Sequence, residues 1–268
     1  MSSELTAEQV KNLSEASARF LEGRLNFQSG QYEEAELLLK DAFRLRELAL
    51  GKEDQGLASI ADELGLSYMA HGRYEDAEQQ FKTSLAILEK NFYPGHARHY
   101  PVLEHLGDCL TARQEYAEAE PVLKRALEIS EKTVSGEHRA IFELIWKLAG
   151  VYQKLEKYSD AEVLLAKGMK QLETPLGPID EFRYQLAVIL AALGKDNEAE
   201  VAYRQAIEGL TKRRDYKRLT ECLDSFAGFL KKIGQTSQSE EASKRARLIR
   251  QTYGKSDHDI FPATLLRA

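Results

Sequence analysis

The chain has little of what marks a disulfide-bonded or membrane-spanning protein. Only two of its 268 residues are cysteines, Cys109 and Cys222, and their separation fits neither a metal-ligand pattern nor a disulfide framework. Its longest apolar stretch, around Tyr184 to Leu193, is too short to span a bilayer, and the first residues form no apolar signal core. We therefore expect a cytoplasmic protein with buried, reduced thiols and no membrane contact.

The chain also lacks the excess of positive charge that would hold a nucleic-acid backbone. Lys and Arg number 37 against 43 Asp and Glu, so the formal net charge is -6. Hydrophobic residues make up 43% of the chain, which is enough to build a substantial core. The composition thus predicts a folded protein for which nucleic acid is not an expected partner.

What the sequence does contain is an internal repeat. The segment Tyr32-Glu-Glu-Ala-Glu36 has close copies that begin at Tyr74, Tyr116 and Tyr158, each 42 residues after the one before. Two weaker copies contain Ala199 and Ser239 at the position of the alanine. A period of this length is typical of stacked helical repeats. The sequence therefore predicts six repeats, near residues 16–57, 58–99, 100–141, 142–179, 180–219 and 220–254.

Each repeat has the pattern of a helix hairpin. Apolar and small residues at helical spacing precede the tyrosine, as in Leu64 and Gly65, and follow it, as in Ala77 and Phe81. Small residues lie where the two helices would cross, which allows close axes. They are Gly23, Gly65, Gly107, Ala149, Ala187 and Ala227. Because one hairpin cannot bury its apolar stripe alone, we expect an all-α, right-handed superhelix of six stacked hairpins over residues 1–254.

The small residue, glycine and tyrosine of the first helix and the Tyr-x-x-Ala-Glu start of the second resemble the tetratricopeptide repeat. The 42-residue period is similar to the long repeats of kinesin light chains, most closely between Tyr116 and Lys132 and on to Gly136-Glu-His138. The resemblance extends from about Ala16 to Tyr253. It implies an α-solenoid that holds another polypeptide, although such repeats serve many unrelated systems.

In this fold the usual ligand surface is the concave face, which first-helix residues line at alternating spacings of four and three. The second and third repeats place four carboxylates on this face. They favour a basic ligand segment, and a solvated acidic face is the alternative. They are Asp62, Glu63, Glu104 and Asp108. Trp146 and Tyr184 hold the same position of the first helix in the fourth and fifth repeats. They would either anchor a ligand or pack on neighbouring helices.

No pattern of residues predicts catalysis, a metal or a cofactor. His96, His99 and His105 cluster in sequence, but their spacing fits no zinc site. A glycine-rich phosphate loop, a nucleophile motif and a supported acid–base pair are all missing from the sequence. We interpret the chain as a protein-binding scaffold or adaptor, and the alternative is a module that assembles into homo-oligomers through its repeat faces.

The two ends and one connection depart from the regular repeat. Thr6-Ala-Glu-Gln9 predicts a capping box that begins a long first helix. Pro175 and Pro178 mark a shortened connection between the fourth and fifth repeats. The tail, residues 255–268, lies outside the repeats, and its apolar residues, including Phe261, either cover the last helix or occupy a groove in competition with a ligand.

Overall fold

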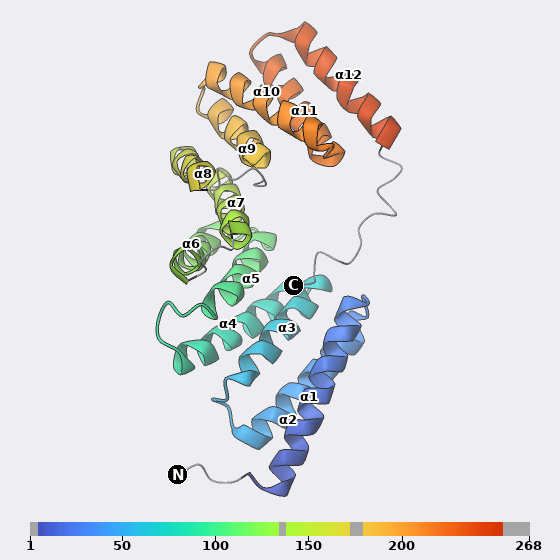
Figure 1. The fold of residues 1–268 in the computed structure, drawn as a ribbon, viewed down its shortest axis with the longest axis vertical. Helices are drawn as coiled ribbons and strands as arrows, with labels where there is room; N and C mark the ends of the chain where they lie inside the picture. Colours follow the sequence, from blue (N-terminus) through green and yellow to red (C-terminus); the bar gives the residue numbers. More distant parts are fainter. Residues whose placement is uncertain (1–4, 134–137, 172–178, 254–268) are drawn as a thin grey trace. The chain divides into compact units, whose positions relative to one another are not determined.

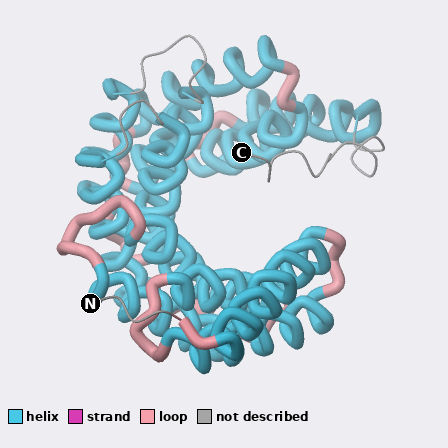
Figure 2. The backbone as a smooth tube through the Cα atoms, turned by 60° about the horizontal axis from the view of Figure 1, so that its bottom comes forward, coloured by secondary structure: helices cyan, strands magenta, loops and turns pink. Residues whose placement is uncertain are grey.

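A computed structural model describes residues 5–133, 138–171 and 179–253. Within these residues it contains twelve α-helices. None of the described residues forms a strand, as the colouring of Figure 2 shows. The chain divides into two compact units, Met1–Lys147 and Leu148–Ala268, which we call unit 1 and unit 2. The prediction of an all-α repeat fold is confirmed.

The helices follow one another as hairpins, with each second helix beginning at the repeated motif (Figure 1). Unit 1 holds α1 (Ala7–Gln28), α2 (Tyr32–Leu50), α3 (Gly56–Ala70), α4 (Tyr74–Asn91), α5 (His99–Ala112), α6 (Tyr116–Thr133) and the start of α7 (His138–Lys154). Unit 2 holds the rest of α7 with α8 (Tyr158–Gln171), α9 (Ile179–Ala192), α10 (Asp196–Arg213), α11 (Tyr216–Lys232) and α12 (Thr236–Tyr253).

The turn inside each hairpin is made at one repeat position with a left-handed backbone. In the second hairpin this residue is Gly72, with φ +73°, and its N–H donates to the carbonyl of Met69. A left-handed residue stops a helix and frees the chain to start the next one two residues later. The residues at this position are Gly30, Gly72, Gln114, Glu156, Gly194 and Gly234, all with positive φ. Glycine is thus the commonest solution here, but two hairpins turn without it.

The small residues at the helix crossings have the predicted role. A Cβ atom on Gly65 would lie 2.5 Å from Cε1 of Phe81, and one on Gly107 would lie 2.4 Å from Cδ2 of Leu123. Both of the large side chains are fully buried. The absence of a side chain on the first helix therefore lets the second helix bury a large one directly against its backbone.

The start of α1 is capped as the sequence predicts. The Thr6 N–H donates to Oε1 of Gln9 over 2.9 Å, and the Gln9 N–H donates to Oγ1 of Thr6 over 3.2 Å. These reciprocal bonds are the predicted capping box. Pro175, Pro178 and the tail of residues 255–268 lie outside the described residues.

Candidate partner-binding surface

The glutamate that ends the repeated motif joins neighbouring repeats. Nη1 of Arg73, which lies just before the second motif, donates to Oε2 of the buried Glu36 over 2.9 Å. One repeat later Arg113 pairs with Glu78, and in unit 2 Nζ of Lys195 donates to Oε1 of Glu162 over 2.7 Å. The sequence reasoning treated this glutamate only as a marker of the repeat. The signal for its role was the cation that recurs 33 to 37 residues later.

A second contact between repeats uses a backbone carbonyl. The hydroxyl of Ser67 donates to the carbonyl of Tyr32 over 3.1 Å, and the thiol of Cys109, 42 residues further on, donates to that of Tyr74 over 3.2 Å. Burial raises the pKa of the Cys109 thiol to about 11 and that of Cys222 to about 12. A thiol that stays protonated is a poor nucleophile. Both cysteines are therefore the buried, unreactive thiols that the sequence predicts.

The carboxylates predicted on α3 each have a cationic neighbour. Oδ1 of Asp62 lies 2.9 Å from Nδ1 of His105 on α5, and Oε1 of Glu63 lies 2.9 Å from Nε of Arg24 on α1. Burial lowers the pKa of His105, but the hydrogen bond and charge of Asp62 outweigh it, so the pKa is raised. Burial also raises the pKa of Glu63, and Arg24 opposes that effect.

The carboxylates predicted on α5 share one lysine. Nζ of Lys147 donates to Oε1 of Glu104 over 2.5 Å and to Oδ2 of Asp108 over 2.7 Å. Burial lowers the pKa of Lys147, but the two carboxylates outweigh it, so the lysine is held in its charged form. Sequence reasoning missed these cations. His105 follows Asp62 by 43 residues and Lys147 follows Glu104 by 43, so a base placed one repeat and one residue after an acid was the available signal.

A hollow of about 430 Å³ opens between α1, α3 and α5 of unit 1. Three of its lining residues, Phe20, Arg24 and Asp62, lie on the first helices of their hairpins, and Asp62 is one of the carboxylates that the sequence predicts for the ligand face. The others are Ala58, Ser59, Glu63, Ser84, Leu88, Arg98, Pro101 and Val102. Two of the four predicted carboxylates thus line this hollow.

The two predicted aromatic residues pack on neighbours within their own units. Trp146 in unit 1 stacks on Phe142 of the same helix, with ring centroids 6.3 Å apart. Tyr184 in unit 2 lies against the hydrophobic core, 6.3 Å from Tyr203. The packing alternative describes both side chains, and because they belong to different units their joint role in a groove stays a prediction.

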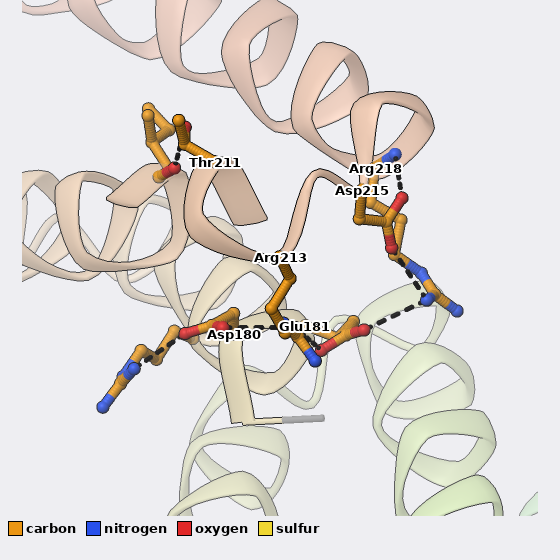
Figure 3. A network of polar contacts seen from close by, with 8 residues as sticks. Asp180, Glu181, Thr211, Arg213, Asp215 and Arg218 are labelled. Carbon is orange, nitrogen blue, oxygen red and sulfur yellow. Dashed lines mark hydrogen bonds and ion pairs between the residues drawn. The ribbon is translucent and has the colours of Figure 1, made fainter. Parts of the chain in front are cut away.

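Unit 2 has a buried acidic pair at the start of α9 (Figure 3). Asp180 and Glu181 are 6% and 3% exposed. Nη2 of Arg213, at the end of α10, lies 3.1 Å from Oδ2 of Asp180 and 2.7 Å from Oε2 of Glu181. Nη1 of Arg218, on α11, donates to Oε1 of Glu181 over 3.0 Å. A Cβ atom on Gly209 would lie 2.0 Å from Cγ of Asp180, so this glycine makes room for the carboxylate. The network ties the ends of three helices together.

The histidine cluster shows no ligand arrangement. The rings of His96 and His99 lie 6.4 Å apart, and Nδ1 of His99 is 2.9 Å from the carbonyl oxygen of His96. Over residues 5–133, 138–171 and 179–253, no group of three or more His, Cys, Asp or Glu side chains could hold a metal ion. No helix of this part of the chain is long and apolar enough to cross a membrane.

Helix hairpins that repeat one crossing, one turn and one set of contacts define a helical-repeat protein. Residues 7–90 and 101–174 match a family model described as tetratricopeptide repeat, and residues 63–132 and 180–208 match two further models of that description. The chain belongs to the tetratricopeptide-repeat family. No curated protein sequence matches it.

Several solved structures share the fold. A putative kinesin light chain with nearly identical repeats, from Podosopora anserina, is 23% identical and has a TM-score of 0.66, over 74% of this chain and 96% of that one. BtubC from P. vanneervenii is 15% identical, with a TM-score of 0.62 over 96% and 94%. A signal transduction ATPase with a tetratricopeptide-repeat sensor, from Pyrococcus horikoshii, is 18% identical, with a TM-score of 0.73 over 89% and 36%. These likenesses extend to the fold only.

Proposed function

We propose that this chain is a cytoplasmic protein-interaction scaffold, not an enzyme, and that it binds a polypeptide segment in the hollow of unit 1. The observation that carries the proposal is the lining of this hollow, which combines the aromatic ring of Phe20 with the carboxylates of Asp62 and Glu63. A solenoid of helical repeats supplies the extended concave surface that such a ligand needs.

The charges of this surface favour a cationic ligand. The four carboxylates on α3 and α5 carry four negative charges, and Arg24 and Lys147 offset two of them. His105 offsets a third when it is protonated. A ligand lysine or arginine would supply a positive charge for Asp62 when His105 is neutral, and for the pair of carboxylates on α5 that shares the single Lys147. An apolar ligand side chain would contact Phe20.

The ligand must displace or share existing partners, which limits its affinity for the carboxylates. Arg24 is bound to Glu63 and His105 to Asp62, so a new cation adds to pairs that are already formed. The charges therefore contribute chiefly to the rate of association and to its salt dependence, and apolar contacts set the rate of release. Trp146, which also belongs to unit 1, is the further apolar contact that we propose for a longer ligand, and a binding role for Tyr184 of unit 2 stays a separate prediction.

Selection from a displayed library of short random peptides tests this proposal. We expect enrichment of peptides that combine Lys or Arg with an aromatic or large aliphatic residue. Fluorescence anisotropy should then show weaker binding and a smaller salt dependence for the double variant Asp62→Asn, Glu63→Gln. Phe20→Ala should mainly speed up release.

Glu208→Gln is the matched control, because Glu208 is an exposed carboxylate on α10 that pairs only with Lys212 among the ion pairs of the described residues. It should bind like the wild type. Enriched peptides without basic residues, or equal binding by the Asp62→Asn, Glu63→Gln variant, would contradict the proposed site.

A further inference from the structure

One side of α1 carries large apolar residues that nothing in the described structure covers. Val10, Leu21 and Leu25 are 53%, 59% and 62% exposed. Their spacing puts them on one side of the helix, away from the buried Gly23, which faces α2. The residues between them on this side are small and exposed: Ser14, Ser17 and Ala18. We call these six residues the α1 stripe.

In later repeats two positions of this stripe are an interface. The position of Leu25 corresponds to Ser67 and Cys109, which are fully buried and bond to the carbonyls of Tyr32 and Tyr74 in the preceding hairpin. The position of Ala18 corresponds to Ile60 and Val102, which are also buried. The α1 stripe therefore exposes a face that this fold elsewhere packs against a second helix.

A further repeat of the same kind does not fit this face. Glu15 and Glu22 take the positions at which α3 has the buried residues Leu57 and Leu64. Stacking a hairpin on α1 as the hairpins stack elsewhere would bury two carboxylates without partners, which is strongly unfavourable. The occupant must cover the α1 stripe and leave Glu15 and Glu22 at its edge.

We propose that the occupant is a second copy of this chain, whose α1 packs antiparallel on the first about a two-fold axis. In this arrangement Val10 of one copy lies opposite Leu25 of the other, and the small Ser14 lies opposite the large Leu21. Each contact occurs twice, as an isologous interface requires. Small residues opposite large ones let the helices approach closely.

The flanking charges select the antiparallel direction. Lys11 and Glu22 lie on the same edge of the stripe, and neither has an ion-pair partner within the described residues. In the antiparallel pair Lys11 of each copy comes close to Glu22 of the other. In a parallel pair this edge of one copy would lie across the seam from the same edge of the other, so Lys11 and Glu22 would not meet. Packing of α1 on α12 of another copy would set the stripe against exposed Lys244, Arg247 and Arg250.

The size of the interface sets its strength. One pair of helices of this length buries an area at or below the low end of the range for specific complexes, about 1,200 Å² in total. The dimer should therefore form and dissociate with concentration in the micromolar range, and it would leave the hollow of unit 1 free to bind a ligand.

Analytical ultracentrifugation of the full chain over a range of concentrations tests the proposal. We expect a reversible monomer–dimer equilibrium for the wild type. The double variant Asp62→Asn, Glu63→Gln, which alters the hollow of unit 1, should show the same dissociation constant. Leu21→Glu and Leu25→Glu should each weaken self-association by at least about tenfold. Leu37→Glu and Leu48→Glu are matched controls, because these leucines are equally exposed on α2 outside the stripe. Circular dichroism melting verifies that each variant folds.

A charge exchange tests the direction of packing. Lys11→Glu and Glu22→Lys should each weaken the dimer, and the double variant should restore it. A wild type that stays monomeric at all concentrations overturns the proposal, as does a dimer that Leu25→Glu leaves intact or a double variant that is not restored. If the chain is monomeric and hydrogen exchange in α1 quickens when residues 255–268 are removed, the tail is the occupant instead.

Discussion

Unit 1 and unit 2 build the same hairpin with different side chains at the crossing. In unit 1 a glycine lies beneath a large buried side chain, as with Gly65 beneath Phe81. In unit 2 the same position is Ala187 in one hairpin and Ala227 in the next, and both belong to a core that contains Tyr203. The methyl group takes part of the space that a glycine leaves for its neighbour. The repeat thus keeps a small residue at the crossing, but this residue is not always glycine.

The polar contacts of the two units differ in a related way. In unit 1 the pairs Asp62–His105 and Glu104–Lys147 lie in partly exposed positions along the first helices. In unit 2 the acids Asp180 and Glu181 are buried and depend on arginines. Buried charges lose water and need fixed partners, whereas exposed charges do not. The network of Asp180 and Glu181 should therefore be more sensitive to loss of charge than the two pairs of unit 1, although unit 1 also has one buried acid, Glu36. Unit 1 should be more sensitive to loss of space at its glycine crossings.

The largest expected effect is the loss of the arginine that binds both buried acids. Arg213→Met keeps most of the side-chain volume but leaves Asp180 with Arg183 only and Glu181 with Arg218 only. Removing one partner of a buried pair costs about 3–5 kcal/mol, and the remaining arginines should reduce this to about 3 kcal/mol. Urea denaturation measures the free energy of unfolding.

Lys212→Met is the control for this variant. Lys212 precedes Arg213 on the same helix, but it pairs with Glu208 at the surface, so its loss should leave stability unchanged. Hydrogen exchange should locate the effect of Arg213→Met in α9, α10 and α11. Equal stabilities for the two variants would show that the buried acids do not depend on Arg213.

The second effect tests the demand for space in unit 1. Gly65→Ala would place a methyl group 2.5 Å from the buried ring of Phe81, so the ring or the helix must move. Overpacking of this kind costs about 1–3 kcal/mol. Thermal melting of the variant, with hydrogen exchange in α3 and α4, measures the cost.

At Gly228 in unit 2 we expect the substitution to alanine to change the stability in the opposite direction. A Cβ atom there would meet no atom within 4 Å, and the residue lies inside α11. Gly228→Ala should therefore stabilise the chain by about 1 kcal/mol, because alanine is the better helix former. If both substitutions raise the melting temperature, helix propensity and not the crossing controls the result.

The fold could be predicted from the sequence because its determinants recur. The motif at Tyr32, Tyr74 and Tyr116 fixes the register, and the register fixes which residues cross and which turn. Gln114 shows the limit of reasoning by residue type, since it takes the left-handed backbone that glycine has at Gly72. The repeat position indicates a turn there, and the residue type alone does not.

The candidate site could be predicted only in part, because its charges are set by pairs between repeats. The sequence located the acids of α3 and α5, but it did not show that they pair with basic residues of neighbouring repeats. Asp62 pairs with His105, and Glu104 pairs with Lys147. Side-chain direction across neighbouring helices depends on packing, which spacing along one helix does not specify. The buried pair Asp180 and Glu181 in unit 2 gave no such signal, because acids in the first turn of a helix are usually exposed.

The smallest effect uses pH to separate the units. Burial lowers the pKa of His105, but Asp62, Glu104 and Asp108 raise it by more, so its pKa in the folded chain lies above the usual 6.5. A pKa that is higher in the folded state stabilises the fold fully below 6.5, and this contribution is lost as the pH rises through the folded pKa. Raising the pH from about 6 to about 8 should therefore loosen the contact between α3 and α5 of unit 1.

The arginine pairs of unit 2 keep their charge over this range, so hydrogen exchange in α9 to α11, corrected for the intrinsic effect of pH, should stay constant. His105→Gln isolates the contribution of one histidine among the six in the chain. The glutamine can still donate a hydrogen bond to Asp62 but cannot be protonated, so the loss of stability with rising pH should be smaller in the variant than in the wild type. Equal slopes of unfolding free energy against pH would show that the Asp62–His105 contact is the same in both protonation states. The difference between the units would then rest on the buried acids of unit 2 alone.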